Sequence, residues 1–144
     1  MNQKIYLIVG APGSGKTWVT GQLKDQYKVL KHDDLAYGNG QTRESYVQKA
    51  MKESAHSAKP IIIETPSSIR QIFEPLTKAG FKVEPVFILE HENVIRRRYF
   101  ERENKPIPAQ HISRLQTYRQ RAKDMRAFSG TSTEVLNYLK RRFN

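Results

Sequence analysis

The sequence of 144 residues contains no cysteine, and none of its apolar runs approaches the length of a membrane span. The first absence excludes disulfide bonds and thiolate metal sites. The second predicts that no segment crosses a membrane, because a spanning helix needs about 20 apolar residues. The first apolar run, residues 5–9, is too short for a secretory signal and is not followed by a cleavage site. We therefore expect a soluble, cytosolic protein that forms one domain over residues 1–144.

Acidic residues are also scarce. Asp and Glu total 14 against 25 Lys and Arg, which gives a net charge of +11. Such an excess favours a polyanionic partner such as DNA, because Lys and Arg neutralise phosphates and release counterions. A solvated basic surface without a partner is the alternative. The four histidines are scattered along the chain without the spacing of metal ligands, so they predict no metal site.

Residues 10–17 are the most informative part of the sequence. They fit the pattern G-x-x-x-x-G-K-[ST] of loops whose backbone N–H groups hold nucleotide phosphates. A β-rich apolar run precedes them, and an apolar stripe with helical spacing follows. The pattern predicts an ATP site in which Lys16 reaches the β- and γ-phosphates and Thr17 ligates Mg²⁺. A glycine-rich turn that binds nothing is the alternative. The predicted nucleotide-binding residues of this loop are Gly10, Ala11, Pro12, Gly13, Ser14, Gly15, Lys16 and Thr17.

Predicted strands and helices alternate along the chain. Apolar runs predict strands at residues 5–9, 27–31, 60–66 and 81–89. Apolar periodicity and capping signals predict helices after Lys16, at 42–57, from 68 to Gly80, at 92–103, at 109–128, and from a Thr131/Glu134 capping box onward. This alternation is typical of an α/β domain with a short, mainly parallel sheet flanked by helices.

Ligands of such sheets bind beyond the carboxyl ends of the strands. Asp33 and Asp34 follow the second predicted strand, and Glu64 and Thr65 end the third. Phosphoryl transfer to an alcohol benefits from a carboxylate that accepts the proton of the acceptor hydroxyl. We predict Asp33 as this general base, ahead of Asp34; a turn or a helix N-cap is the alternative for the pair. Glu64 either orients a magnesium-bound water or the acceptor, or it pairs with Lys16.

The predicted helix at 92–103 is strongly basic, and a Pro-containing segment at 104–108 ends it. We expect residues 94–108 to form an arginine-rich helical lid over the nucleotide, because Arg clamps phosphate through two parallel hydrogen bonds. Arg96, Arg98 and Arg102 are the predicted phosphate contacts, on one shared face, with Arg97 directed elsewhere. A solvated basic helix is the alternative.

Taken together, these stretches resemble the 5′-kinase domain of bacteriophage polynucleotide kinase, one of a larger group of small P-loop kinases. The resemblance covers about residues 3–125. It is carried by the loop at 10–17, the His-Asp-Asp at 32–34, the Glu-Thr at 64–65, the Gly-Phe-Lys-Val-Glu at 80–84, and the segment at 94–119. It implies a P-loop kinase fold, Asp33 as the general base, and Arg102 as a lid arginine that contacts ATP, with Arg96 matching an earlier lid arginine.

The sequence departs from that family where the acceptor binds. The family has an arginine three residues after its catalytic aspartate, and Ala36 stands there in this chain. Glu64 stands where the family has aspartate, and the lid is about two residues longer. Asp34 and Thr65 are further predicted acceptor-binding residues, and Tyr37, Arg43 and Arg70 are local candidates to replace the missing arginine.

The leading functional hypothesis is therefore an ATP- and Mg²⁺-dependent kinase that acts on a hydroxyl in DNA. The acceptor is either a 5′-hydroxyl end or, as in related phage kinases, the hydroxymethyl group of 5-hydroxymethyluracil. The alternative is a small-molecule kinase such as a nucleoside or nucleoside monophosphate kinase. A third hypothesis, based on the basic surface alone, is a nucleotide-dependent DNA-binding module or switch that hydrolyses ATP slowly or not at all.

Overall fold

The computed structural model describes residues 4–11, 13–31, 43–64 and 69–143. Within these ranges one five-stranded sheet has the strand order β2-β3-β1-β4-β5, and every pair of neighbouring strands is parallel. The strands are β1 (Lys4–Gly10), β2 (Lys28–Leu30), β3 (Ile61–Glu64), β4 (Lys82–Ile88) and β5 (Phe128–Gly130). The helices are α1 (Lys16–Leu23), α2 (Arg43–His56), α3 (Ile69–Lys78), α4 (Glu92–Glu103), α5 (Ala109–Asp124) and α6 (Ser132–Phe143).

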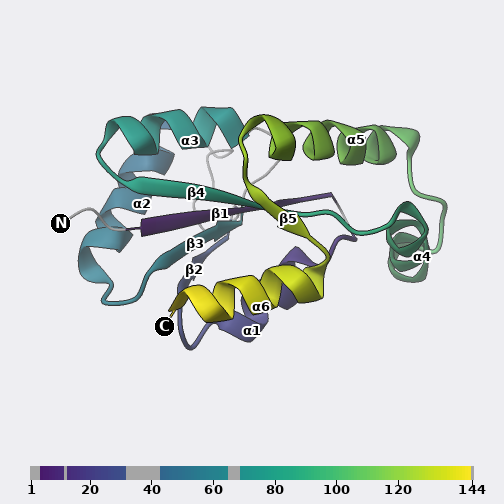
Figure 1. The fold of residues 1–144 in the computed structure, drawn as a ribbon, viewed down its shortest axis with the longest axis horizontal. Helices are drawn as coiled ribbons and strands as arrows, with labels where there is room; N and C mark the ends of the chain where they lie inside the picture. The colour runs from purple at the N-terminus through teal and green to yellow at the C-terminus, as the bar shows by residue number, and fades with distance from the viewer. Residues whose placement is uncertain (1–3, 12, 32–42, 65–68, 144) are drawn as a thin grey trace.

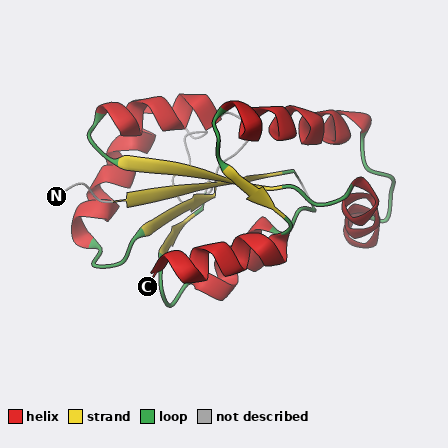
Figure 2. Cartoon of the chain, in the orientation of Figure 1, coloured by secondary structure: helices red, strands yellow, loops and turns green. Residues whose placement is uncertain are grey.

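Helices cover both faces of the sheet (Figures 1 and 2). α1 and α6 lie on one face, and α2, α3 and α5 lie on the other, whereas α4 stands beyond the carboxyl end of β1 (Figure 1). This is the α/β fold with a parallel sheet that the sequence predicts. None of the helices in the described ranges has the length and apolarity needed to cross a bilayer.

The alternation of side chains along β1 divides the core into two layers. Ile5, Leu7 and Val9 pack with apolar residues of α2, α3 and α5, while Tyr6 and Ile8 pack with those of α1 and α6. Successive side chains of a strand point to opposite faces of the sheet, so a central strand covered on both sides is apolar throughout. This explains why residues 5–9 are all apolar and buried. The carboxyl end of β1 leads into the glycine-rich loop.

Two predicted helix signals are confirmed. Gly80 ends α3 with a left-handed φ of 100°, and the N–H of Phe81 donates to the carbonyl of Leu76 at 3.2 Å. The Thr131/Glu134 capping box is also formed: the Thr131 N–H donates to Glu134 Oε1 at 3.0 Å, and the Glu134 N–H donates to Thr131 Oγ1 at 3.3 Å. Both signals satisfy helix-end groups that have no partner inside the helix.

The predicted helix over 109–128 is wrong at its end. α5 stops at Asp124, and Phe128–Gly130 forms β5, an edge strand that pairs with β4. The stop is a left-handed residue, Arg126 with a φ of 51°, after which the N–H of Ala127 donates to the carbonyl of Ala122 at 3.0 Å. Glycine is the usual residue at this position of a helix end, so an arginine there gives no stop signal in the sequence.

Candidate active site

The glycine-rich loop leads directly from β1 into α1. Gly13 and Gly15 have left-handed φ angles of 84° and 100°. A Cβ atom at Gly13 would lie 3.3 Å from the carbonyl oxygen of Ile95, and one at Gly15 would lie 3.1 Å from Cβ of Ser132. Glycine is required at both positions by the backbone conformation and by the close approach of neighbouring segments.

The start of α1 is suited to an anion. Its N-cap is Gly15, which provides no side-chain hydrogen bond, and its first turn carries no acidic residue. The N–H groups of a first helical turn have no partners within the helix, and the helix dipole places partial positive charge there. A phosphate group at this end would accept hydrogen bonds from these N–H groups.

Lys16 and Glu64 form the charged centre of the loop region. Burial lowers the pKa of the Lys16 ammonium group, and the negative charge of Glu64 opposes that shift. Glu64 ends β3, is 8% exposed, and lies beside Ile8 of β1 in the sheet register. The electrostatic interaction with Lys16 agrees with the predicted pairing of these two residues. The second predicted role of Glu64, orienting a magnesium-bound water, stays a prediction.

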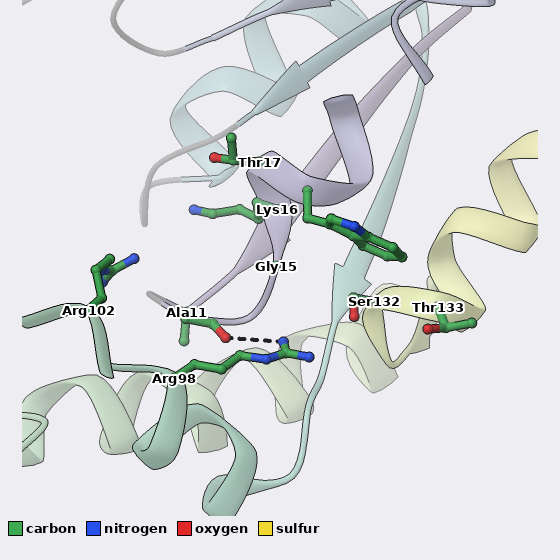
Figure 3. A pocket seen from close by; sticks show the side chains of 10 residues that line it. Ala11, Gly15, Lys16, Thr17, Arg98, Arg102, Ser132 and Thr133 are labelled. Carbon is green, nitrogen blue, oxygen red and sulfur yellow. Dashed lines mark hydrogen bonds between the residues drawn. The ribbon is translucent and has the colours of Figure 1, made fainter. Parts of the chain in front are cut away.

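A cavity of about 580 Å³ opens at the loop (Figure 3). Among the residues that the structure describes, its lining includes three cationic side chains, Lys16, Arg98 and Arg102, and no carboxylate. It is lined by Ala11, Gly13, Gly15, Lys16, Thr17, Trp18, Arg98, Arg102, Ser132 and Thr133. In a concave, partly desolvated site this concentration of positive charge favours a polyphosphate.

The α4 helix brings two of its predicted arginines to this cavity. Arg98 Nη1 donates to the carbonyl oxygens of Gly13 and Ser14, at 3.3 Å each, and the first of these bonds is drawn in Figure 3. Arg102 is one helical turn further along the same face and lies over the ring of Tyr99, 5.5 Å from its centroid. The two hydrogen bonds of Arg98 hold α4 next to the loop, whereas the contact of Arg102 with Tyr99 lies within α4. The role of α4 as a lid stays a prediction.

Arg96 does not share this face. In an α-helix it lies about 200° around the axis from Arg98, and its guanidinium pairs with Glu92 at 3.6 Å. It lines a separate hollow together with Arg97, the arginine that we expect to point elsewhere. A contact between Arg96 and a phosphate stays a prediction, and it would require a different placement of α4.

The predicted acceptor side of the site lies outside the described residues. This holds for the predicted base Asp33, for Asp34, Tyr37 and Thr65, and for Pro12 of the loop. The side chains of Arg43 and Arg70 also lie outside the description, although their backbones belong to α2 and α3. The described residues therefore cover the side of the site that the sequence predicts to hold the phosphate donor.

Magnesium fits the donor chemistry of this site. Mg²⁺ in nucleotide sites uses one or two protein oxygens together with phosphate oxygens and waters. Thr17 presents a hydroxyl at the cavity, and Glu64 is a nearby carboxylate at the end of β3. Among the described residues no three His, Asp or Glu side chains form a cluster that would hold a metal ion by itself. A metal here would thus be bound together with the nucleotide, chiefly through Thr17.

Several residues of the cavity escape the sequence analysis. Trp18 is 49% exposed, an unusual state for the single tryptophan of the chain, and it lines the cavity beside the start of α6. Ser132 and Thr133 complete that wall. The helical spacing of the apolar residues after Lys16 places Trp18 on the same stripe as Val19 and Leu23, but only the latter two are buried in α1. Ser132 and Thr133 reach the cavity only because α6 packs next to α1 (Figure 1).

Comparison with known proteins gives fold relatives only. The chain matches no protein-family model and no curated protein. It is similar in structure to a gluconokinase from Sinorhizobium meliloti 1021, with a TM-score of 0.62 and 18% identity over 94% of this chain and 88% of that one. A tunicamycin resistance protein from Deinococcus radiodurans gives a TM-score of 0.65 and 20% identity over 82% and 81%. A shikimate kinase from Acinetobacter baumannii in complex with shikimate gives 0.58 and 16% over 96% and 91%.

These likenesses define the fold class. The chain has the α/β fold of P-loop kinases, with its glycine-rich loop between β1 and α1. The narrower resemblance to phage polynucleotide kinase stays a prediction from the sequence.

Proposed function

We propose that this protein is an ATP-dependent phosphotransferase that moves the γ-phosphate to an alcohol oxygen of its acceptor. One observation carries the proposal: the N-terminal end of α1, Lys16, Thr17 and two arginines of α4 line the same cavity. Phosphoryl transfer depends mainly on positioning and on stabilising the charge that develops on the transferred group. The charges that line this cavity are suited to that task.

Each group has a defined part in the proposed reaction. Lys16 and the first-turn N–H groups of α1 hold the β- and γ-phosphates, and Arg102 adds positive charge from the lid. Mg²⁺, bound through Thr17, would neutralise charge on the phosphate oxygens. Asp33, our predicted general base, would accept the proton of the acceptor hydroxyl as that oxygen attacks phosphorus. The nucleoside end of ATP extends along Trp18 towards Ser132 and Thr133, where an aromatic ring offers a surface for stacking.

We favour a small-molecule alcohol as the acceptor, with a nucleoside as the leading candidate. A nucleoside monophosphate, the other small-molecule alternative, would instead accept the γ-phosphate on a phosphate oxygen and would need no general base. Two of the similar structures, the gluconokinase and the shikimate kinase, are small-molecule kinases, which supports this choice. The second candidate is a hydroxyl on DNA, either a 5′ end or a hydroxymethylated base. It is supported by the net charge of +11, which favours a polyanionic substrate through counterion release.

The test is a panel assay with γ-labelled ATP and Mg²⁺. The panel offers nucleosides, nucleoside monophosphates, small polyols, DNA with a 5′-hydroxyl, DNA containing 5-hydroxymethyluracil, and RNA, and mass spectrometry maps the phosphorylated atom. We expect labelled product on at least one alcohol. Absence of transfer to every class, with ATP still bound, would contradict the kinase proposal and favour a nucleotide-dependent binding module.

Salt dependence separates the two acceptor classes. The logarithm of the affinity for DNA falls linearly with the logarithm of the salt concentration. The slope is about 0.9 per neutralised phosphate on a duplex and about 0.7 on a single strand. A kinase with a small, weakly charged acceptor has no such steep dependence. An acceptor KM that is nearly independent of salt therefore supports the small-molecule acceptor, whereas a steep rise in KM supports DNA.

A further inference from the structure

Glu90 is a buried carboxylate to which the phosphate-transfer chemistry assigns no role. It follows β4, is 5% exposed, and lies next to the point where the N–H of Leu89 donates to the carbonyl of Gly130 at 2.7 Å. Its Oε1 accepts two hydrogen bonds from Ser132, one from the backbone N–H at 2.8 Å and one from Oγ at 2.7 Å. A buried charge without such partners is strongly destabilising, so these contacts define the position of the carboxylate.

The same oxygen also faces α4. Arg98 Nη1 lies 3.7 Å from Glu90 Oε1 and donates to the carbonyl oxygens of Gly13 and Ser14. Glu90 thereby connects three segments that line one cavity: the phosphate-binding loop, the lid helix and the start of α6. Figure 3 shows Arg98 reaching below the loop in the direction of Ser132.

The hydrogen bonds of Arg98 constrain the direction of a loop N–H. The carbonyl of Ser14 and the N–H of Gly15 belong to one peptide unit, and no peptide bond of the described chain is cis. In a trans peptide these two groups point in opposite directions. Because Arg98 holds the Ser14 carbonyl on its own side, the Gly15 N–H points away from α4. The N–H of Ser14 is already engaged, since it donates to the carbonyl of Ala11 at 3.0 Å.

We propose that Glu90 is a positioning residue for phosphate recognition, acting through Arg98 on the loop backbone. It touches no substrate. Its charge holds the guanidinium at the two loop carbonyls, and this keeps the Gly15 N–H directed at the bound phosphate. Arg98 then serves mainly to shape the loop, and Arg102 is the lid cation directed at the nucleotide. The proposal rests on the proposed function, because it assumes that the cavity binds a polyphosphate.

The direct test is Glu90→Gln, which keeps the shape of the side chain and an acceptor for Ser132 but removes the charge that attracts Arg98. Calorimetry would measure the binding of ATP and of pyrophosphate. Pyrophosphate has no nucleoside, so it tests the loop without the proposed contacts to Trp18, Ser132 and Thr133. We expect both dissociation constants to rise about tenfold, the size of effect typical for one hydrogen bond to a charged group. In steady-state assays the KM for ATP should rise while kcat at saturating ATP changes little. The matched control is Glu101→Gln, which removes an exposed carboxylate of α4 that pairs with Arg97 instead of Arg98.

A double-mutant cycle tests whether the loss of affinity in Glu90→Gln depends on Arg98. In an Arg98→Met background, Glu90→Gln should cause no further loss of pyrophosphate affinity, because its connection to the loop is already absent. Wild-type affinity in Glu90→Gln, or a full additional loss in the Arg98→Met background, would overturn the inference. Circular dichroism and urea unfolding establish that each variant folds. If Glu90→Gln does not fold, Arg98→Lys carries the test: it should raise the dissociation constants of both ATP and pyrophosphate, and wild-type affinity there would overturn the inference.

The two proposals fail in different ways. Wild-type protein that binds neither ATP nor pyrophosphate would contradict the proposed function, and the positioning role would fall with it. Wild-type protein that binds both ligands, with Glu90→Gln and Arg98→Lys indistinguishable from it, would overturn the positioning role alone.

Discussion

Lys16 and Glu64 act on each other at the centre of the proposed phosphate site: burial lowers the pKa of the Lys16 ammonium group, and the charge of Glu64 raises it in part. We expect a bound polyphosphate, which carries more negative charge than Glu64, to raise the pKa of this ammonium group. The affinity for ATP should therefore report on the protonation of Lys16.

The first prediction concerns pH. ATP binding requires the protonated Lys16, so affinity should be constant at lower pH and should fall as pH rises through the pKa of that group. Because this pKa lies below the ordinary 10.5, the fall should begin earlier than for an exposed lysine. Glu64→Gln removes the interaction that raises the pKa and should move the fall to still lower pH. Calorimetric titrations from neutral pH up to the ordinary lysine pKa of 10.5 measure this; an affinity that stays flat across that range would contradict it.

The second prediction concerns Lys16 itself. Lys16→Ala should lower the rate of phosphate transfer by about 10²–10³-fold, whatever the acceptor, because a fixed cation is lost where charge develops. Lys24→Ala removes an exposed lysine at the end of α1 and serves as the control, with a rate near that of the wild type. Initial rates with γ-labelled ATP measure both. Equal rates for the two variants would show that Lys16 does not belong to the donor site.

The third prediction tests Asp33, which lies outside the described residues. Asp33→Asn should lower turnover by about 10²–10⁴-fold, the usual contribution of a general base, while ATP affinity is retained. Asp25→Asn, an exposed aspartate just after α1, is the control. Turnover and calorimetric ATP binding are measured on the same preparations. Unchanged product formation in Asp33→Asn would remove this residue from its predicted role.

The fourth prediction uses the single tryptophan of the chain as a reporter. Trp18 lines the cavity and is 49% exposed, so bound ATP should cover its indole and change its fluorescence. Trp18→Ala should weaken ATP binding about 2- to 10-fold, the range of one aromatic contact, and should leave pyrophosphate binding unchanged. Fluorescence titration and calorimetry together check this. Calorimetrically saturated protein with unaltered emission would place the nucleoside elsewhere.

The fifth prediction compares two glycines of opposite effect. Gly80→Ala should lower the free energy of unfolding by about 1–2 kcal/mol, because the left-handed backbone that ends α3 disfavours a Cβ atom. Gly21→Ala should raise it by about 0.5–1 kcal/mol, because Gly21 lies within α1 and a Cβ there meets nothing within 4 Å. Urea unfolding at fixed pH measures both changes. The same sign for both variants would contradict the helix end at Gly80.

Much of the fold can be predicted from the sequence because its signals are local. The strand-loop-helix order around the glycine-rich loop, the apolar run of β1 and the Thr131/Glu134 capping box each depend on residues within a few positions of one another, and the structure confirms all three. The fifth strand is not predicted because no local signal marks it. Arg126 adopts the left-handed conformation usual for glycine, and the three residues of β5 become a strand only by pairing with β4.

The cavity itself combines both kinds of information. Lys16 and Thr17 are evident from the motif, and Arg98 and Arg102 from a basic helix with the appropriate spacing. Arg96 is the counter-example: it belongs to the same arginine cluster, yet it pairs with Glu92 away from the cavity. Residue type and short-range spacing do not show which side of α4 packs against the loop.

Local chemistry is sufficient to specify the glycine-rich loop motif, the first four strands with the helices between them, and the α/β class, because backbone turns, caps and apolar periodicity involve near neighbours in the chain. Only the tertiary structure determines which residues Glu90 and Arg98 contact. Glu90 meets a serine 42 positions away, and Arg98 meets a loop carbonyl 84 positions away. Such contacts exist only after parallel strands have brought distant loops to one edge of the sheet, and no pattern of neighbouring residues encodes them.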